Sequence, residues 1–187
     1  MPNRPMNLKK IIGAALLCAA LPLSANAATV SSGTWTLQGT YSFDFDAGVQ
    51  NTALNQPSMD VFWEQYTSTT RGLQAINGAG IYNLGTSTNF ANLTFADLQG
   101  LTYGSGAIDG SDASNQLVQG DVFAVKTNAG NYAKVLVTGP FGAANGYGLP
   151  IQWQTLSPAV SEVPEPASVA LFGVGLLGMF MVRRKRA

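Results

Sequence analysis

The fold is decided by the stretch Asp121-Val-Phe-Ala-Val-Lys-Thr127, Asn128-Ala129-Gly130, Asn131-Tyr-Ala-Lys-Val-Leu-Val-Thr138. β-Branched and aromatic residues fill both arms, as is typical of strands. Gly130 can adopt the positive φ angle that a short hairpin loop requires. The stretch therefore predicts an antiparallel hairpin, the starting point of a sheet.

Similar short runs, broken by turn residues, lie on both sides of this hairpin. We expect strands at 34–38, 40–44, 61–66, 80–84, 92–95 and 151–155. No stretch keeps a helical period, although 95–101 can form one helical turn. About eight to ten strands in one small domain predict an all-β fold, a single antiparallel β-sandwich or flattened barrel. The aromatic residues expected in its core and at its rim are Trp35, Phe43, Phe45, Phe62, Trp63, Phe123 and Trp153.

Composition and charge exclude several classes of function. Of the 187 residues, 11% are charged and 46% hydrophobic, which argues against a disordered chain. Between Ala28 and Val160, three cations stand against eight carboxylates, a net charge of −5 that would repel a phosphate backbone, so we expect no nucleic-acid partner. The chain has no histidine, which removes the commonest general base and every Ser-His-Asp arrangement.

The first 27 residues have the layout of a secretory signal peptide. A basic segment ends at Lys10, an apolar run follows at 11–20, and the small residues Ala25 and Ala27 precede Ala28. We expect signal peptidase to cleave between Ala27 and Ala28. The only cysteine, Cys18, lies inside the apolar run, so the mature chain must be held by its core and not by disulfides.

The C-terminal end has three parts in fixed order. Val163-Pro164-Glu165-Pro166 precedes an apolar stretch at 167–182, and Arg183-Arg184-Lys185-Arg186 follows. A helix over 167–182 would be about 24 Å long, which snorkelling side chains and local thinning can fit to a bilayer core of ~30 Å. The cations would stay on the cytoplasmic side. This predicts an extracytoplasmic all-β domain at 28–156, a linker at 157–162 and a membrane-anchored tail at 163–187.

This tail resembles the PEP-CTERM sorting signal, in which Pro-Glu-Pro precedes a transmembrane helix and a basic cluster. The resemblance implies processing by exosortase in a Gram-negative bacterium, after transient anchoring in the inner membrane and on the way to the cell surface or beyond it. It also implies a link to exopolysaccharide or biofilm. Two prolines around Glu165 keep that segment extended, as a processing site requires. The arms at 120–125 and 131–137 are similar to extracellular modules of uncharacterised function.

Three functions follow from these residues. We expect a structural or interaction protein without enzymatic activity. The first alternative is a carbohydrate-binding module that contacts sugar through Trp63, Glu64, Tyr66 and Trp153, because exposed aromatic faces stack on sugar rings. The second is a glycoside hydrolase that pairs Glu64 with an aspartate at a carboxylate separation of about 5 to 9.5 Å.

Two further features are open to a simple conformational explanation. Asp44-Phe45-Asp46 and Asp109-Gly110-Ser111-Asp112 could supply oxygen ligands to Ca²⁺, but such residues also favour turns, and we expect no metal or cofactor. Lys126 and Lys134 are expected on the exposed face of the hairpin, where they would resist edge pairing.

Overall fold

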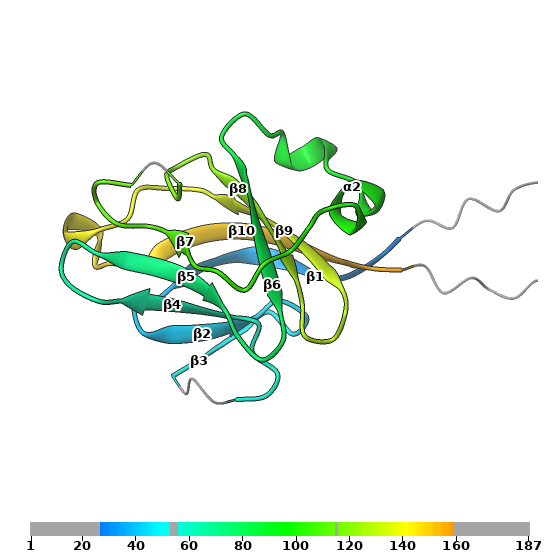
Figure 1. Ribbon diagram of the computed structural model, residues 1–187, viewed down its shortest axis with the longest axis horizontal. Coiled ribbons are helices and arrows are strands. Elements are labelled where there is room, and N and C mark those ends of the chain that lie inside the picture. The colour runs from blue at the N-terminus through cyan, green and yellow to red at the C-terminus, as the bar shows by residue number, and fades with distance from the viewer. Residues whose placement is uncertain (1–26, 53–55, 115, 159–187) are drawn as a thin grey trace, which may run out of the picture. The chain divides into compact units, whose positions relative to one another are not determined.

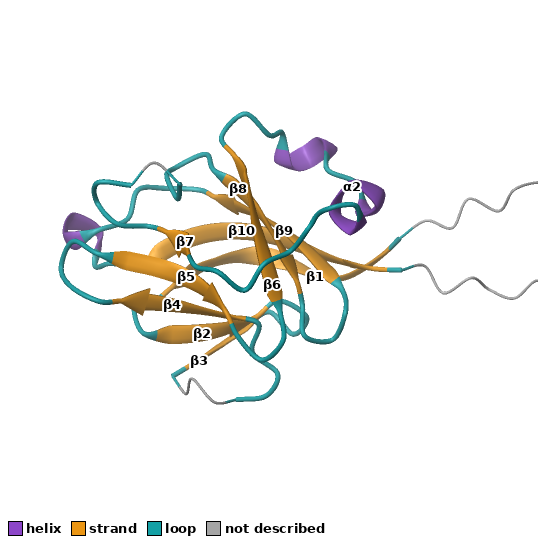
Figure 2. Ribbon diagram, viewed as in Figure 1, coloured by secondary structure: helices purple, strands orange, loops and turns teal. Residues whose placement is uncertain are grey.

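The computed structural model describes residues 27–52, 56–114 and 116–158, which belong to one compact unit. The predicted signal peptide up to residue 26 and the sorting tail from Val163 lie outside the described residues. The described part carries ten strands and only short helical segments (Figures 1 and 2).

The strands form two five-stranded antiparallel sheets. Sheet A has the order β1 (Ala28–Leu37), β10 (Leu149–Ser157), β9 (Tyr132–Val137), β8 (Val122–Lys126), β6 (Gly80–Gly85). Sheet B has the order β3 (Val49–Asn51), β2 (Tyr41–Asp44), β4 (Val61–Gln65), β5 (Arg71–Ala75), β7 (Ile108–Asp109). The predicted all-β sandwich is confirmed, with β1 and β10 joining the first and last parts of the described chain.

The predicted hairpin is confirmed and lies at the centre of sheet A. β8 and β9 pair in register, so that Phe123 lies opposite Val135. Gly130 has a φ of 88°, and the backbone N–H of Thr127 donates to the carbonyl of Asn131 at 2.9 Å. The positive φ needed in the loop therefore falls on the residue that adopts it at least cost.

The predicted strand at 92–95 is wrong. Residues Phe90–Asn92 form a 3₁₀ helix, and Phe95–Gln99 form the short helix α2, within the helical turn expected at 95–101. Thr94 and Asp97 form a capping box in which each side chain accepts a hydrogen bond from the other residue's backbone N–H. This local capping outweighs the β-propensity of the residues just before it. The prediction also missed β3, β5 and β7, which are short or carry glycine and amide residues.

The core lies between the sheets and is built from alternate residues of each strand. Trp35 lies at its rim, with 48% of its surface exposed. The large side chains that fill the core are Leu37, Phe43, Phe45, Trp63, Leu73, Phe123, Ile151 and Trp153. This arrangement confirms five of the predicted aromatic positions as core, namely Phe43, Phe45, Trp63, Phe123 and Trp153, and Phe62 is buried as well.

A second, smaller cluster corrects the prediction for Lys134. The segment that contains α2 folds over the outer face of sheet A, where Leu98 packs with Ala124 and Leu156. Lys134 is buried beneath this cover; its Nζ donates to the carbonyl of Leu93 at 3.0 Å and lies 4.9 Å from the centre of the Phe90 ring. Burial lowers the pKa of Lys134. Only Lys126 of the pair is exposed.

Candidate functional site

Trp63 and Trp153, two of the predicted sugar contacts, lie inside the core. The Trp63 side chain is 0% exposed, its Nε1 donates to the carbonyl of Tyr147 at 2.8 Å, and its ring meets Phe141 edge-on at 5.5 Å. The Nε1 of Trp153 donates to Ser31 Oγ at 3.1 Å. Neither indole offers an open face on which a sugar could stack, which corrects this part of the prediction.

Glu64 and Tyr66 lie on the outer face of sheet B. Because side chains alternate along a strand, the inward position of Trp63 directs Glu64 outward, and Tyr66 follows on the same side. Tyr66 is 53% exposed. Gln74 of the neighbouring strand β5 donates through Nε2 to Glu64 Oε2 at 2.6 Å and also to the Tyr66 hydroxyl. We name Glu64, Tyr66 and Gln74 the Tyr66 patch.

The Tyr66 ring lies over Gly72 of β5. A Cβ atom at Gly72 would lie 3.5 Å from the ring, an ordinary van der Waals contact, so the ring lies close over β5 at this position. Burial of the hydroxyl raises the pKa of Tyr66, and the nearby Glu64 carboxylate adds to this effect. The hydroxyl therefore stays protonated at neutral pH. The patch presents one aromatic ring beside a carboxylate and an amide, groups that can stack on a sugar and bind its hydroxyls.

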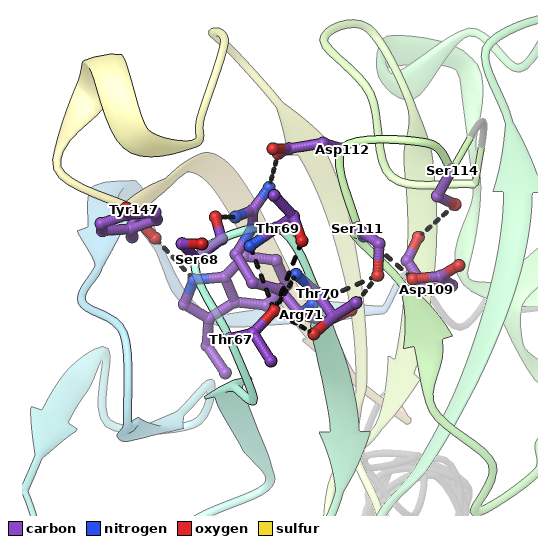
Figure 3. Close-up of polar contacts among 11 residues, drawn as sticks. Thr67, Ser68, Thr69, Thr70, Arg71, Asp109, Ser111, Asp112, Ser114 and Tyr147 are labelled. Atoms are coloured by element: carbon purple, nitrogen blue, oxygen red, sulfur yellow. Dashed lines mark hydrogen bonds and ion pairs between the residues drawn. The ribbon is translucent and has the colours of Figure 1, made fainter.

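Arg71 is a buried charge that sequence reasoning did not single out (Figure 3). Its side chain is 1% exposed; Nη2 pairs with the Asp112 carboxylate and Nη1 donates to the carbonyl of Ser68 at 2.9 Å. The guanidinium lies 5.9 Å from the ring centre of Phe141 and 5.7 Å from that of Tyr147. Arg71 thereby connects the loop before β5, the loop after β7 and the loop before β10.

A hollow of about 330 Å³ adjoins this cluster. Several polar side chains of its lining already form hydrogen bonds within the protein. Ser114 Oγ donates to the carbonyl of Asp109 at 2.8 Å, and Gln119 Nε2 to that of Thr138 at 3.4 Å. Arg71 Nε has no hydrogen-bond partner among the described residues, but it is buried away from solvent. The arrangement is that of a structural clamp on three loops.

The structure brings Asp60 to the predicted Asp44–Asp46 cluster. One carboxylate oxygen from each of the three residues lies within 4.8 Å of the others. Asp60 accepts the backbone N–H groups of Phe45 and Asn128, both at 2.8 Å, and Asp44 Oδ1 accepts those of Asp46 and Ala47. The clustered carboxylates therefore have a structural explanation: they accept hydrogen bonds from backbone N–H groups and stabilise the turns around them. The carboxylates of the Asp109–Asp112 segment also form contacts within the protein: Asp109 Oδ1 accepts from the backbone N–H of Ser111, and Asp112 pairs with Arg71.

Burial raises the pKa of Asp60 to about 7. The two backbone donors lower it, and the charges of Asp46 and Asp44 raise it further. The three clustered carboxylates do not include Glu64, which the hydrolase hypothesis requires. Within the described residues, Glu64 is held by Gln74 on an open sheet face.

A second hollow, of about 410 Å³, lies on the outer face of sheet A. It is lined by residues of β1 and β10 and by Phe90, namely Ser32, Gly33, Thr34, Phe90, Gln152, Trp153 and Gln154; the Trp153 side chain itself is buried. This surface carries amides and hydroxyls and no charged group. It is a further place at which an uncharged polar polymer could hydrogen-bond.

The predicted sorting residues, Val163 to Pro166 and Arg183 to Arg186, lie outside the described residues, as does Ala25. Ala27 and Ala28 are described, and β1 begins at Ala28. No helix in the described ranges has the length and apolar character needed to cross a membrane. The predicted helix at 167–182 belongs to the tail.

The comparison with protein families decides what this tail is. A family model for the PEP-CTERM protein-sorting motif matches residues 162–186. The tail carries a PEP-CTERM protein-sorting motif. The motif supports export, transient membrane anchoring and sorting by exosortase. Searches of curated proteins and of solved structures found no match. The role of the β-sandwich that precedes this motif therefore has to be argued from its own geometry.

Proposed function

We propose that this protein is a surface or extracellular-matrix protein whose β-sandwich has a structural or interaction role and catalyses no reaction. The sorting motif at residues 162–186 carries the proposal, because it follows directly on a folded β-sandwich. Sorting by exosortase connects the protein to exopolysaccharide or biofilm. Signal peptidase and exosortase are its processing partners, and the final location is the cell surface or the medium.

The use of the buried polar groups supports a structural role. Arg71 joins three loops, Asp60 accepts two backbone N–H groups, and Trp63 and Trp153 donate their ring N–H groups inside the core. Enzymes keep such groups poised toward a cleft. Here they hold the sandwich together, and the open surfaces carry hydroxyl, amide and aromatic side chains.

The intact mass of the protein recovered from the cell surface and medium tests the sorting step. We expect a chain that begins at Ala28 and ends between Val163 and Pro166, formed only in cells that contain exosortase. A paired Pro164→Ala and Pro166→Ala variant should lose this processing, because it no longer keeps the segment extended. The matched control, Pro158→Ala, should be processed normally. A chain that still ends at Ala187 in both strains would contradict the proposal.

A second candidate function is favoured by the Tyr66 patch. Carbohydrate-binding surfaces combine an exposed aromatic ring with hydrogen-bonding groups beside it. Tyr66 supplies the ring, and Glu64 and Gln74 supply an acceptor and a donor on the same open face of sheet B. On this reading the interaction partner of the sandwich is the polysaccharide itself.

Replacing Tyr66 with alanine tests this candidate. Loss of one stacking ring costs about 1 to 1.5 kcal/mol, so we expect affinity for polysaccharide from the same cells to fall about tenfold. Affinity electrophoresis in gels containing that polysaccharide measures the change. Tyr82→Ala is the control, because Tyr82 is also exposed but lies on β6 of the other sheet. Equal retardation of both variants and the natural chain would reject the Tyr66 patch as the binding surface.

A further inference from the structure

The four edges of the two sheets are protected very differently. β1 and β6 are the edges of sheet A, and β3 and β7 those of sheet B. An edge strand presents backbone N–H and C=O groups that can pair with another chain, and proteins usually block this with short strands, charges, prolines or bulges.

Three of the edges are blocked. β6 already pairs beyond its own sheet, since Ile81 N donates to the carbonyl of Gly104 at 2.8 Å and Gly104 N donates back at 3.1 Å. A bulge between Asn83 and Gly85 also disturbs its register. β3 has only three residues and β7 only two. None of these strands can support a long intermolecular pairing.

β1 is the long edge, and its one irregularity is a bulge between Thr29 and Ser31, which leaves the register from Ser31 to Leu37 regular. It is ten residues long, and the sequence from Ala28 to Phe43 has no charged residue and no proline. Its partner on one side is β10, and no described strand pairs with it on the other. Val30 is 42% exposed and Trp35 48%. Gln50 Oε1 accepts from Trp35 Nε1 near the end of β1 and from Gln38 N just after it, and Ser31 Oγ donates to the carbonyl of Phe45.

We propose that β1 pairs antiparallel with β1 of a second copy of this chain, so that the two sheets A become one continuous sheet. A second copy of β1 is the expected partner, because β1 is the only edge strand among the described residues that is long enough to pair along the whole length of β1. An antiparallel pair of identical strands sets their Thr, Ser and Val residues side by side, which favours the contact. None of the eight carboxylates of the domain lies on β1 itself, so the pairing of two β1 strands brings no like-charged side chains directly opposite each other.

A second copy of the chain is thus the partner in the structural role proposed above. The inference rests on that proposed function, because it requires the protein to be exported from the cytoplasm. Pairing through β1 would form dimers in the matrix. In each copy the Tyr66 patch lies on sheet B, away from the paired sheets A. Since Tyr66 lies on the outer face of sheet B, a β1 dimer leaves that patch free to meet polysaccharide.

Single cysteines provide the first test, because the mature chain has none of its own. Ser32, Thr34 and Thr36 lie on the outer face of β1, and a two-fold axis near one of them brings its two copies within the 4.4 to 6.8 Å that a disulfide spans. We expect at least one of Ser32→Cys, Thr34→Cys and Thr36→Cys to be recovered from cells mainly as a disulfide-linked dimer. Tyr82→Cys, on the blocked edge, should remain monomeric. Equal cross-linking at Tyr82 and on β1, or none on β1, would overturn the proposal.

Sedimentation of the protein recovered from the surface or medium is the second test. We expect a concentration-dependent dimer that weakens at least tenfold when Val30 and Thr34 are both changed to lysine, because the new charges would meet across the axis. Tyr82→Lys should dissociate like the natural chain. A monomer up to about 100 μM, or a dimer insensitive to the lysines, would reject the pairing. Intact masses of the same samples report processing separately, so loss of pairing and loss of sorting are distinguished.

Discussion

Replacing Trp63 with alanine is expected to lower the free energy of unfolding by about 3 to 5 kcal/mol. The ring is wholly buried between the sheets, meets Phe141 edge-on and lies against Gly110, where a Cβ atom would be only 2.5 Å from it. The substitution leaves a cavity that this closely packed surrounding cannot fill. It also leaves the carbonyl of Tyr147 without the hydrogen bond from Nε1.

Urea unfolding followed by circular dichroism measures this effect. Tyr66→Ala is the matched control, since it removes an aromatic ring from an exposed position and should change stability by no more than about 0.5 kcal/mol. The two variants separate the two roles of aromatic residues: Trp63 acts through the core, and Tyr66 through the surface. A loss below about 1 kcal/mol for Trp63→Ala would show that the indole is not a structural residue.

The stability of the domain is expected to fall as the pH rises from about 4 to about 7, by on the order of 3 kcal/mol. Burial raises the pKa of Asp60 to about 7, whereas an unfolded aspartate titrates near 3.9. Between these values the folded chain binds a proton that the unfolded chain has lost. Each step upward in pH therefore favours the unfolded state, until Asp60 is ionised in both states above about pH 7.

Asp121 acts in the same direction over a narrower range. It is 1% exposed, its Oδ2 has no partner among the described residues, and burial raises its pKa to about 6. Its contribution is lost between about pH 4 and pH 6 as the carboxyl ionises in the folded state. The measured curve should therefore be steepest below pH 6 and flatten above pH 7.

Unfolding free energies at pH 4.5, 6 and 8 check this prediction, and Asp60→Asn provides the comparison. The variant removes the titrating group, so its stability should change much less between pH 6 and pH 8 than that of the natural chain. Asp112→Asn, which changes an exposed carboxyl, should keep the natural pH dependence. Stability that rises between pH 4.5 and pH 7 in the natural chain would contradict a raised pKa for Asp60.

Where a structural signal is local and complete, sequence reasoning found it. The β8–β9 hairpin was predictable because alternation, β-branched residues and Gly130 all fall within eighteen residues. The segment at 92–95 was mispredicted because two local signals compete there. Its β-propensity is weak, and the Thr94–Asp97 capping box decides in favour of a helix.

Where a residue's role depends on distant parts of the chain, the pattern was insufficient. Lys134 appeared as a surface charge on a hairpin, but the segment around α2, some 40 residues earlier, folds over it. Arg71 pairs with Asp112 across 41 residues and lies between rings from a third segment. Of the predicted sugar contacts, only Glu64 and Tyr66 reach the surface, together with Gln74, which no motif pointed to.

The sequence by itself determined the all-β class, the central hairpin and the PEP-CTERM identity of the tail, because each depends on residues that are contiguous in the chain. The tertiary structure decided which aromatic rings are buried and which are exposed, how Arg71 is enclosed, and that β1 is the long edge. These properties depend on which strands become neighbours and which face of each strand is covered. In a sandwich whose first strand pairs with its last, that choice is made by packing over the whole domain.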